Sequence, residues 1–400
     1  MANQVSLSPQ DFAPLSPPER LLLGPGPSLV HPRVLRALAM PTIGHLDPHF
    51  LGLMDELQTL LRWLFGTQNA LTFAVSGTGS AGMEACMVNV LQPGDRVVIA
   101  KNGVFGGRMA DIANRLSCVV DTLEVPFGSA IDPAALRQVI AGKPTKLLGF
   151  VHAETSTGVL QPIPPLVEVA REVDALTMMD CVTSLGGVPV EVDGWGIDLA
   201  YAGTQKCLSC PPGLAPVTFS PRAVEVLKQR KTKVASWYLD ATMLLNYWGG
   251  ERVYHHTAPI NMLYALREAA LLLLEEGLPQ VFARHLRMHE ALVAGLSAMG
   301  LRMVVEAGLR IPQLNTVYVP SGISDGAMRK ALLDDFNLEV GGGLGALKDK
   351  AFRIGLMGHS ARAQHVFSCL SALEQVLSVM GAQITRGAAL PAAHAYLAAV

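Results

Sequence analysis

Between residues 70 and 220, short apolar runs alternate with stretches that carry apolar residues at helical spacing. This alternation is typical of βαβ units, whose strands become buried only in a parallel sheet covered by helices. The strand-like runs are Ala70 to Val75, Arg96 to Ala100, Leu147 to Val151, Leu176 to Met179 and Leu199 to Ala202. The helical stretches between them are Ala81 to Val90, Arg108 to Leu116 and Pro165 to Val173. The pattern therefore predicts an α/β fold with a mainly parallel sheet.

The pattern changes after residue 260, where long helical stretches replace the alternation. Ile260 to Glu276 predicts a helix that ends at Gly277, and Gln280 to Met299 predicts the next one. The elements expected beyond them are strands at Met303 to Val305 and Thr316 to Val319, a helix at Asp325 to Phe336, a loop and a final helix. Because 400 residues exceed the size at which one core keeps growing, we expect a smaller α/β domain here.

Domain boundaries follow from these changes in pattern. The first 20 residues hold several prolines without periodicity, which predicts an N-terminal arm. Residues 21–276 are expected to form the large domain and residues 277–381 the small C-terminal domain. The Ala-rich residues 382–400 are expected to form a loose tail.

Composition excludes several classes of protein. Half of the residues are hydrophobic and 16% are charged, which indicates a large buried interior or an extensive subunit interface. No apolar run reaches the roughly 18 residues that a membrane helix requires. A formal charge of -2 without a basic stripe disfavours nucleic acid as a partner. The 6 scattered cysteines and the absence of a leader-like N-terminus favour the cytoplasm.

A lysine and an aspartate follow two neighbouring strands of the predicted sheet. Lys206 comes just after the run Ile197 to Tyr201, and Asp180 ends the run that begins at Leu176. The carboxyl ends of parallel strands meet at one edge of a sheet, so these two groups can reach opposite ends of one flat ligand. Pyridoxal phosphate requires a lysine for the Schiff base and an acid that keeps the pyridine nitrogen protonated. By itself, a lysine after a strand is more often a solvated loop residue.

The turn from Ser76 to Gly82 lies between a predicted strand and a predicted helix. Backbone N–H groups and the helix dipole at such a turn can hold an anion. Its glycines also match the dinucleotide fingerprint, which requires an acid at the end of the next strand. That strand ends in Lys101 and Asn102, so we favour a single phosphate over a dinucleotide. A glycine-rich turn without any ligand remains an alternative.

Other loops at the same predicted edge carry groups that suit a planar ligand. Phe105 can stack on one face of a ring, and Val182 can press on the other face. Thr155 lies in a stretch that offers hydroxyl groups after the strand Leu147 to Val151. A core position explains Phe105 equally well, so the convergence of these loops is more informative than any one residue.

A series of colinear stretches over residues 20–380 makes the chain recognisable. They are LLLGPGPS from Leu21, GHLDPHFLGLMDE from Gly44, SGTGSAGMEA from Ser76, ETSTGVLQP from Glu154, MDCVTSLGG from Met179, GTQK from Gly203, YHHTAPI from Tyr254 and FRIGLMG from Phe352. Together they resemble the class V, fold type I aminotransferases, specifically the alanine–glyoxylate and serine–glyoxylate (serine–pyruvate) enzymes. The resemblance implies a seven-stranded type of sheet flanked by helices, pyridoxal 5′-phosphate as cofactor and a homodimer.

The resemblance also implies roles for residues of this chain. Lys206 would carry the Schiff base and move the proton, while Asp180 would hold the pyridinium proton. The residues implied for the cofactor phosphate are Thr78, Gly79, Ser80 and Gln205. Thr155 would lie near the phenolic oxygen of the ring. Tyr254 and Thr257 would reach the phosphate of the neighbouring subunit.

Substrate choice is implied by fewer residues. Arg353 stands at the position that binds the substrate carboxylate through two parallel hydrogen bonds. Gly26 and Ser184 are expected beside a small side-chain pocket. The implied reaction moves an amino group from alanine or serine to glyoxylate or pyruvate through a pyridoxamine intermediate. A pyridoxamine–pyruvate or 2-aminoethylphosphonate–pyruvate type of enzyme is the alternative, and a dinucleotide-binding oxidoreductase is a remote one.

Two residue pairs resemble metal or redox sites. Cys207 and Cys210 have the spacing of a zinc or thiol motif, but no second cysteine pair is near in sequence, so buried small side chains are expected. His285 and His289 share one face of a helix, which we expect to be solvated. We therefore expect no metal site.

Overall fold

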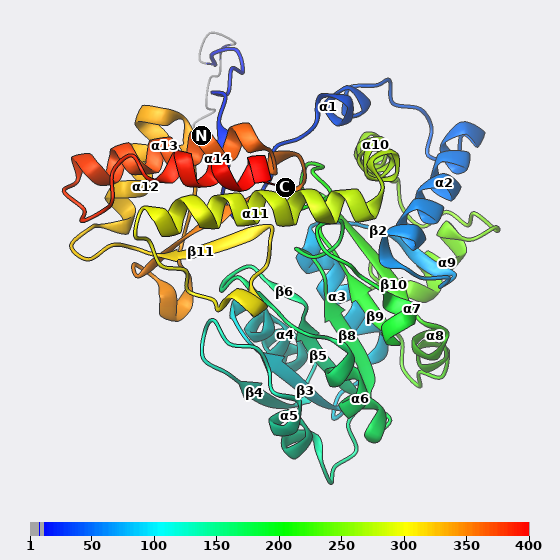
Figure 1. Ribbon diagram of the computed structural model, residues 1–400. Coiled ribbons are helices and arrows are strands. Elements are labelled where there is room, and N and C mark those ends of the chain that lie inside the picture. The colour runs from blue at the N-terminus through cyan, green and yellow to red at the C-terminus, as the bar shows by residue number, and fades with distance from the viewer. Residues whose placement is uncertain (1–7, 9–11, 400) are drawn as a thin grey trace, which may run out of the picture.

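A seven-stranded sheet forms the centre of the protein, whose computed structural model describes residue 8 and residues 12–399 (Figure 1). Its strand order is β2-β10-β9-β8-β5-β3-β4, and only β10 runs antiparallel to its neighbours. The strands are β2 Leu71–Ser76, β3 Arg96–Lys101, β4 Val119–Glu124, β5 Leu147–Val151, β8 Leu176–Asp180, β9 Leu199–Tyr201 and β10 Leu214–Phe219. The predicted α/β fold with a mainly parallel sheet is confirmed.

Helices cover this sheet and bury its strands. The helices of this part are α1 Pro32–Leu38, α2 Pro48–Phe65, α3 Gly79–Val90, α4 Val104–Arg115, α5 Pro133–Ile140, α6 Pro164–Glu172, α7 Val192–Trp195, α8 Pro221–Lys228, α9 Ala241–Trp248 and α10 Ile260–Glu276. Several begin where an N-cap side chain accepts a backbone N–H and a proline follows, as at Asp47 and Ser220. One continuous buried cluster runs from Val34 to Val281 and joins the helices to the sheet.

A second, smaller core lies around a three-stranded antiparallel sheet with the order β11-β14-β13. Its strands are β11 Leu314–Tyr318, β13 Gly341–Gly342 and β14 Ala351–Gly355. Its helices are α11 Leu278–Ala298, α12 Asp325–Phe336, α13 Ala363–Val379 and α14 Ala389–Ala399, with short 3₁₀ turns at η2 Ala307–Leu309, η3 Gly345–Leu347 and η4 Gly358–Ser360. Figure 1 shows α11 extending from this core toward α10 at the edge of the large sheet.

Two short strand pairs complete the fold. β6 Ala153–Glu154 pairs with β7 Val159–Leu160 just beyond the end of β5. β1 Leu21–Leu22 pairs in parallel with β12 Leu338–Glu339. Leu23 is also buried in the second core, so this segment, which the sequence analysis assigns to the large domain, packs against the C-terminal elements.

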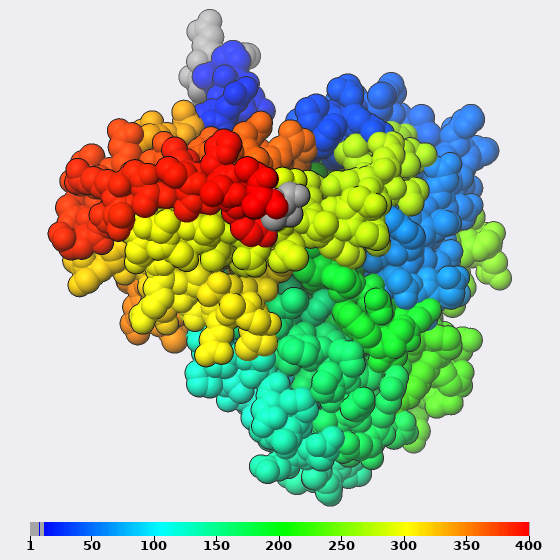
Figure 2. Space-filling view, in the orientation of Figure 1, coloured from blue at the N-terminus to red at the C-terminus, as the bar shows by residue number. Residues whose placement is uncertain are grey.

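Three predictions from sequence need correction. The loose tail is wrong for residues 389–399, because α14 packs along α11 and buries Ala389 and Ala393 (Figure 2). The strand predicted at Met303 to Val305 is reduced to an isolated bridge between Met303 and Val317. His285 and His289 are not solvated: they are 0% and 2% exposed.

Two hydrogen bonds, one within α11 and one to a residue distant in sequence, explain why His285 is buried. His285 Nδ1 donates to Val281 O at 2.7 Å, and its Nε2 accepts from Gly358 N at 2.9 Å. Both ring nitrogens are therefore used by groups in the protein, and burial lowers the pKa of His285 to about 4. Half of the arm predicted over residues 1–20, namely residues 1–7 and 9–11, lies outside the described residues. Within residues 12–399 no helix is long and apolar enough to cross a membrane.

Candidate active site

Lys206 lies in the loop between β9 and β10, beside the segment that follows β1. Its Nζ donates to the carbonyl oxygen of Pro25. A Cβ atom at Gly26 would lie 2.6 Å from Lys206 Nζ, so only glycine leaves room for the lysine there. Burial, followed by the positive charge of Arg353, lowers the pKa of Lys206 to about 8. A substantial fraction of this amine is therefore neutral near physiological pH.

Asp180 ends β8 and faces the same cavity as Lys206. Its carboxylate accepts a hydrogen bond from Tyr201 Oη at 2.6 Å and from Val182 N at 2.8 Å. Burial raises the pKa of Asp180 to about 6, while these two hydrogen bonds oppose that rise. The carboxylate is thus held in one orientation at the floor of the cavity.

The first turn of α3 forms another part of the cavity wall. Thr78, Gly79 and Ser80 line it, and the first N–H groups of a helix have no acceptor within the helix. Ser80 Oγ accepts a hydrogen bond from Arg108 Nη1 at 2.8 Å. The Oε1 atom of Gln205 is buried without a partner among the described residues. The N–H groups of the helix turn suit an anion, whereas the Gln205 oxygen suits a hydrogen-bond donor.

Phe105 lies at the start of α4, where a buried glutamate fixes its backbone. Glu154 Oε2 accepts from Phe105 N at 3.2 Å, and Glu154 Oε1 accepts from Ser156 N at 2.9 Å and Ser156 Oγ at 2.6 Å. Burial raises the pKa of Glu154 to about 7. A Cβ atom at Gly103 would collide with the Glu154 carboxyl, so the close approach depends on that glycine. The guanidinium of Arg108 lies over the Phe105 ring, 5.0 Å from the ring centre.

Arg353 lies on β14 and reaches back to the large sheet. Its Nε donates to Gly342 O at 2.8 Å, and its Nη1 donates to Thr155 O at 2.9 Å. Burial lowers the pKa of Arg353 to about 10, which still leaves it charged at neutral pH. The two carbonyls fix the guanidinium plane between the two cores.

The other predicted site residues are placed differently. Thr155 and Val182 line the same cavity as Lys206 and Asp180, as do Phe105 and Gln205. Ser184 is fully buried behind it, and its hydroxyl has no partner among the described residues. Tyr254, 57% exposed, and the exposed Thr257 lie outside the cavity of their own chain.

The cavity that these residues form, here called the Lys206 cavity, has a volume of about 210 Å³. It is lined by Thr78, Gly79, Ser80, Met83, Phe105, Arg108, Val151, Ala153, Thr155, Asp180, Val182, Thr183, Tyr201, Gln205 and Lys206. An amine, a fixed carboxylate, an aromatic ring and a helix N-terminus around one space match the groups that pyridoxal phosphate requires. Tyr201, Arg108 and Glu154 also contribute to this site and were not predicted from the sequence.

Cysteines next to Lys206 do not form a metal site. Cys207 and Cys210 are free and buried, as predicted. Burial raises the pKa of each thiol to about 12, so both stay protonated at neutral pH. Within the described part of the chain, no group of three or more His, Cys, Asp or Glu side chains is placed to hold a metal ion.

Comparison with known proteins places this site in a family. The class-V aminotransferase family matches residues 33–362. The chain belongs to the class-V aminotransferases, which confirms the predicted family and the aminotransferase class.

Named relatives are similar over nearly the whole chain. The (S)-ureidoglycine–glyoxylate transaminase of Bacillus subtilis is 40% identical over 397 residues, which cover 95% of each chain. The alanine–glyoxylate aminotransferase of Rattus norvegicus is 40% identical over 368 residues, which cover 91% of this chain and 89% of the relative. The crystal structure of an alanine–glyoxylate aminotransferase from Nostoc sp. has a TM-score of 0.91 and 50% identity, and it covers 93% of this chain and 100% of its own.

Proposed function

We propose that this protein is a pyridoxal-phosphate-dependent aminotransferase that moves an amino group from alanine or serine to glyoxylate. The observation that carries the proposal is the single cavity lined by Lys206, Asp180 and the first turn of α3. Bound there, the cofactor supplies a ring that withdraws electrons from the substrate Cα. The names of the relatives support glyoxylate as the acceptor.

The lysine and the aspartate have separate tasks in this proposal. Lys206 binds the cofactor covalently and, once released by substrate, carries the proton to and from the substrate Cα. Its pKa of about 8 suits both tasks, because the neutral amine attacks and accepts protons. Asp180 keeps the ring nitrogen protonated, and Tyr201 with Val182 N holds the carboxylate in place.

Cofactor position depends on the surrounding walls. Phe105 and Val182 would contact the two ring faces, and Thr155 would lie near the phenolic oxygen. The residues that would hold the phosphate are Thr78, Gly79, Ser80 and Gln205. The N-terminal end of α3 supports this assignment, because its first N–H groups have no acceptor within the helix.

Arg353 would bind the carboxylate that all substrates share. Its Nε and Nη1 atoms are fixed by backbone carbonyls, which leaves Nη2 for the substrate. Gly26 next to Lys206 and the buried Ser184 would limit the room for a side chain, which favours alanine or serine. The second candidate for the amino donor is (S)-ureidoglycine, which the name of the Bacillus subtilis relative gives. That relative is 40% identical to this chain. A pyridoxamine–pyruvate or 2-aminoethylphosphonate–pyruvate type of reaction is a further alternative.

We also propose a cytoplasmic homodimer with shared sites. Tyr254 and Thr257 are exposed and outside their own cavity, which supports a role toward the partner's cofactor phosphate. The free cysteines of the described chain support a reducing compartment. Sedimentation should give a dimer, and a fully active monomer would contradict the shared site.

Two experiments test the activity. Borohydride reduction of the cofactor-loaded protein, followed by peptide mapping, should place the label on Lys206. A panel of alanine, serine, ureidoglycine, glutamate and pyridoxamine against glyoxylate, pyruvate and 2-oxoglutarate should give the highest kcat/KM for alanine or serine with glyoxylate. A preference for glutamate with 2-oxoglutarate would overturn the substrate assignment, and a label on another lysine would overturn the site.

A further inference from the structure

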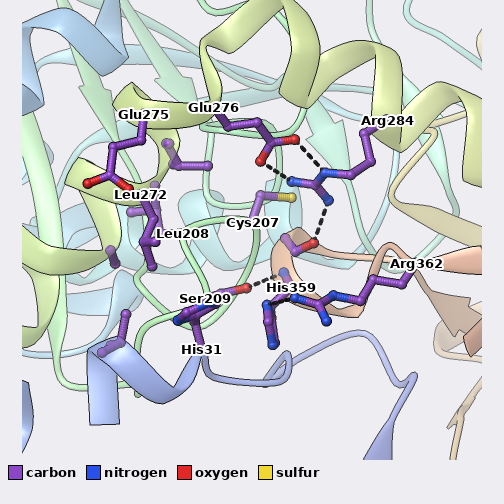
Figure 3. A pocket seen from close by; sticks show the side chains of 14 residues that line it. His31, Cys207, Leu208, Ser209, Leu272, Glu275, Glu276, Arg284, His359 and Arg362 are labelled. Atoms are coloured by element: carbon purple, nitrogen blue, oxygen red, sulfur yellow. Dashed lines mark hydrogen bonds and ion pairs between the residues drawn. The ribbon is translucent and has the colours of Figure 1, made fainter. Parts of the chain in front are cut away.

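A second cavity lies behind the loop that follows Lys206 (Figure 3). We call it the His31 cavity; its volume is about 380 Å³. Cys207, Leu208 and Ser209 form part of its wall and continue directly from Lys206. The rest of the wall comes from α1 and α10 on one side and from η4 and α11 on the other, so the cavity lies between the two cores.

Two histidines lie side by side in this cavity with defined tautomers. Their ring centres are 4.7 Å apart, with the rings edge to face (Figure 3). His31 Nδ1 accepts from Arg33 N at 3.0 Å, and His359 Nδ1 accepts from Arg362 Nη2 at 2.8 Å. Because each Nδ1 is an acceptor, each neutral ring carries its proton on Nε2. Neither Nε2–H has a partner among the described residues, so two donors remain available.

Charge in the His31 cavity is only partly compensated. Glu276 is bound by Arg284 at 2.6 and 2.8 Å, and Glu275 is bound by Arg33 at 2.6 and 2.9 Å. Arg362 forms no ion pair with a carboxylate within the described chain; its guanidinium meets only the His359 ring. One positive charge therefore faces the cavity without an anion.

An apolar wall stands in the same cavity. It consists of Val34, Leu208, Ala269, Leu272 and Leu273. Val34, Leu208 and Leu273 are nearly fully buried, so this wall is preformed. A pocket that combines an apolar wall with a few convergent donors is typical of sites for small organic molecules.

We propose that the His31 cavity binds an organic monocarboxylate. The carboxylate accepts hydrogen bonds from the Nε2–H groups of His31 and His359, while its apolar body packs against Leu208 and Leu272. Arg362, which holds the opposite edge of the His359 ring, fixes the tautomer of that ring and adds a positive charge that favours an anion. The charge-assisted bonds supply affinity, and the apolar wall distinguishes an organic acid from an inorganic anion. This site is separate from the carboxylate position of Arg353 and does not depend on the proposed reaction.

A ligand in this cavity contacts the loop that carries the catalytic lysine. Ser209 Oγ accepts from His359 N at 2.8 Å and contacts Ser28 Oγ at 3.2 Å. Ser28 Oγ in turn donates to Lys206 O at 2.7 Å. A bound carboxylate therefore ties η4 to α1 across the two cores and should raise the unfolding temperature of the protein.

Calorimetric titration of the cofactor-loaded enzyme with hexanoate tests the proposal. We expect saturable binding that Arg362→Gln and His359→Phe each weaken by about 10-fold or more. The matched control is Arg302→Gln, which removes the same charge from an exposed position that does not line the cavity, and it should retain binding. Inorganic phosphate, which lacks an apolar body, should bind at least about 10-fold more weakly than hexanoate.

Two outcomes would overturn the proposal: hexanoate affinity unchanged by Arg362→Gln and His359→Phe, or inorganic phosphate binding as tightly as hexanoate. A measurement on the unmodified protein covers the case in which a variant does not fold. Hexanoate should raise the pKa values of His31 and His359 in an NMR titration, because an anion stabilises the charged imidazoles. Unchanged pKa values at saturating hexanoate would contradict the site. The charged groups that face these two rings are Arg33, Arg36, Glu268, Glu275, Arg284, Arg362 and His365.

Discussion

The Lys206 cavity and the His31 cavity share one loop but differ in how their charged groups are arranged. In the Lys206 cavity, Lys206 and Asp180 face one space from the ends of neighbouring strands, and the charge of Arg353 on β14 acts on Lys206 from outside the cavity lining. In the His31 cavity, the acidic residues are already bound by arginines, and Arg362 is left without a carboxylate. The first arrangement suits proton transfer, and the second suits binding without chemistry.

The two cavities also differ in the pKa values of their titratable groups. In the Lys206 cavity the pKa of Lys206 falls to about 8 and that of Asp180 rises to about 6, so both groups titrate near physiological pH. In the His31 cavity, burial and nearby arginines lower the pKa of His31 and bring that of His359 to about 4. Both imidazoles are therefore neutral donors at pH 7.

Loss of the lysine amine should have the largest effect and should separate the two cavities. Lys206→Ala is expected to lower kcat by about 1,000-fold or more, because one residue both binds the cofactor and moves the proton. Hexanoate affinity at the His31 cavity should not change. Steady-state kinetics and calorimetry check this, with Lys228→Ala on the exposed end of α8 as the control. Retained turnover in Lys206→Ala would show that another amine does the chemistry.

Replacing the guanidinium fork at each cavity should give opposite results. Arg353→Lys keeps the charge but loses the planar geometry, so KM for amino and oxo acids should rise by about 10- to 100-fold. Cofactor affinity should stay the same. Arg362→Lys should leave KM unchanged, since Arg362 lines the His31 cavity alone. If both variants raised KM equally, the two cavities would not be functionally distinct.

Tyr201→Phe tests whether the Tyr201 hydroxyl keeps the Asp180 carboxylate charged. The Tyr201 hydroxyl bond favours the charged form of Asp180, so its loss should raise the pKa of that carboxyl above about 6. The carboxylate then becomes protonated at higher pH, and the acidic limb of kcat/KM should move upward in pH. We also expect kcat/KM to fall by about 10-fold at neutral pH. A parallel fall at every pH, with no movement of the limb, would indicate a packing role only.

Cys207 lies on the wall between the cavities and should give the smallest effect. Its thiol is buried and its pKa is raised to about 12, so the reactive thiolate is scarce at pH 7.5. Mass spectrometry after iodoacetamide treatment of the folded protein should find no label on Cys207. The same treatment in guanidinium should label all 6 cysteines of the chain. Rapid labelling in the folded state would mean that the wall opens.

The Lys206 cavity could be predicted from sequence because its residues follow strands, and strand ends converge by topology alone. Lys206, Asp180 and the turn from Ser76 to Gly82 were found by that argument, and the cavity brings Lys206 and Asp180 together with the residues of that turn. Tyr201 could not be identified as a site residue from the sequence, because a tyrosine at the end of a buried strand is also an ordinary core residue. A role for its phenol follows only from the 2.6 Å hydrogen bond to Asp180, which depends on the pairing of β8 and β9.

Other failures have the same physical origin in contacts that are distant in sequence. The spacing of His285 and His289 suggests a helix face but not what covers it; Gly358 N, 73 residues away, satisfies His285. The His31 cavity joins α1 to η4, and no periodicity links these segments. Alanine-rich residues 382–400 have high helix propensity, yet their helix depends on a surface that α11 provides.

That dependence affects how the protein is made on the ribosome. α14 consists of the final described residues, and it covers α11, which is synthesised about a hundred residues earlier. The large sheet, complete by Phe219, can fold while synthesis continues. Until α14 has been made, the second core carries an uncovered apolar surface on α11. Completion of α14, rather than of the large sheet, therefore decides when this apolar surface becomes buried on a growing chain.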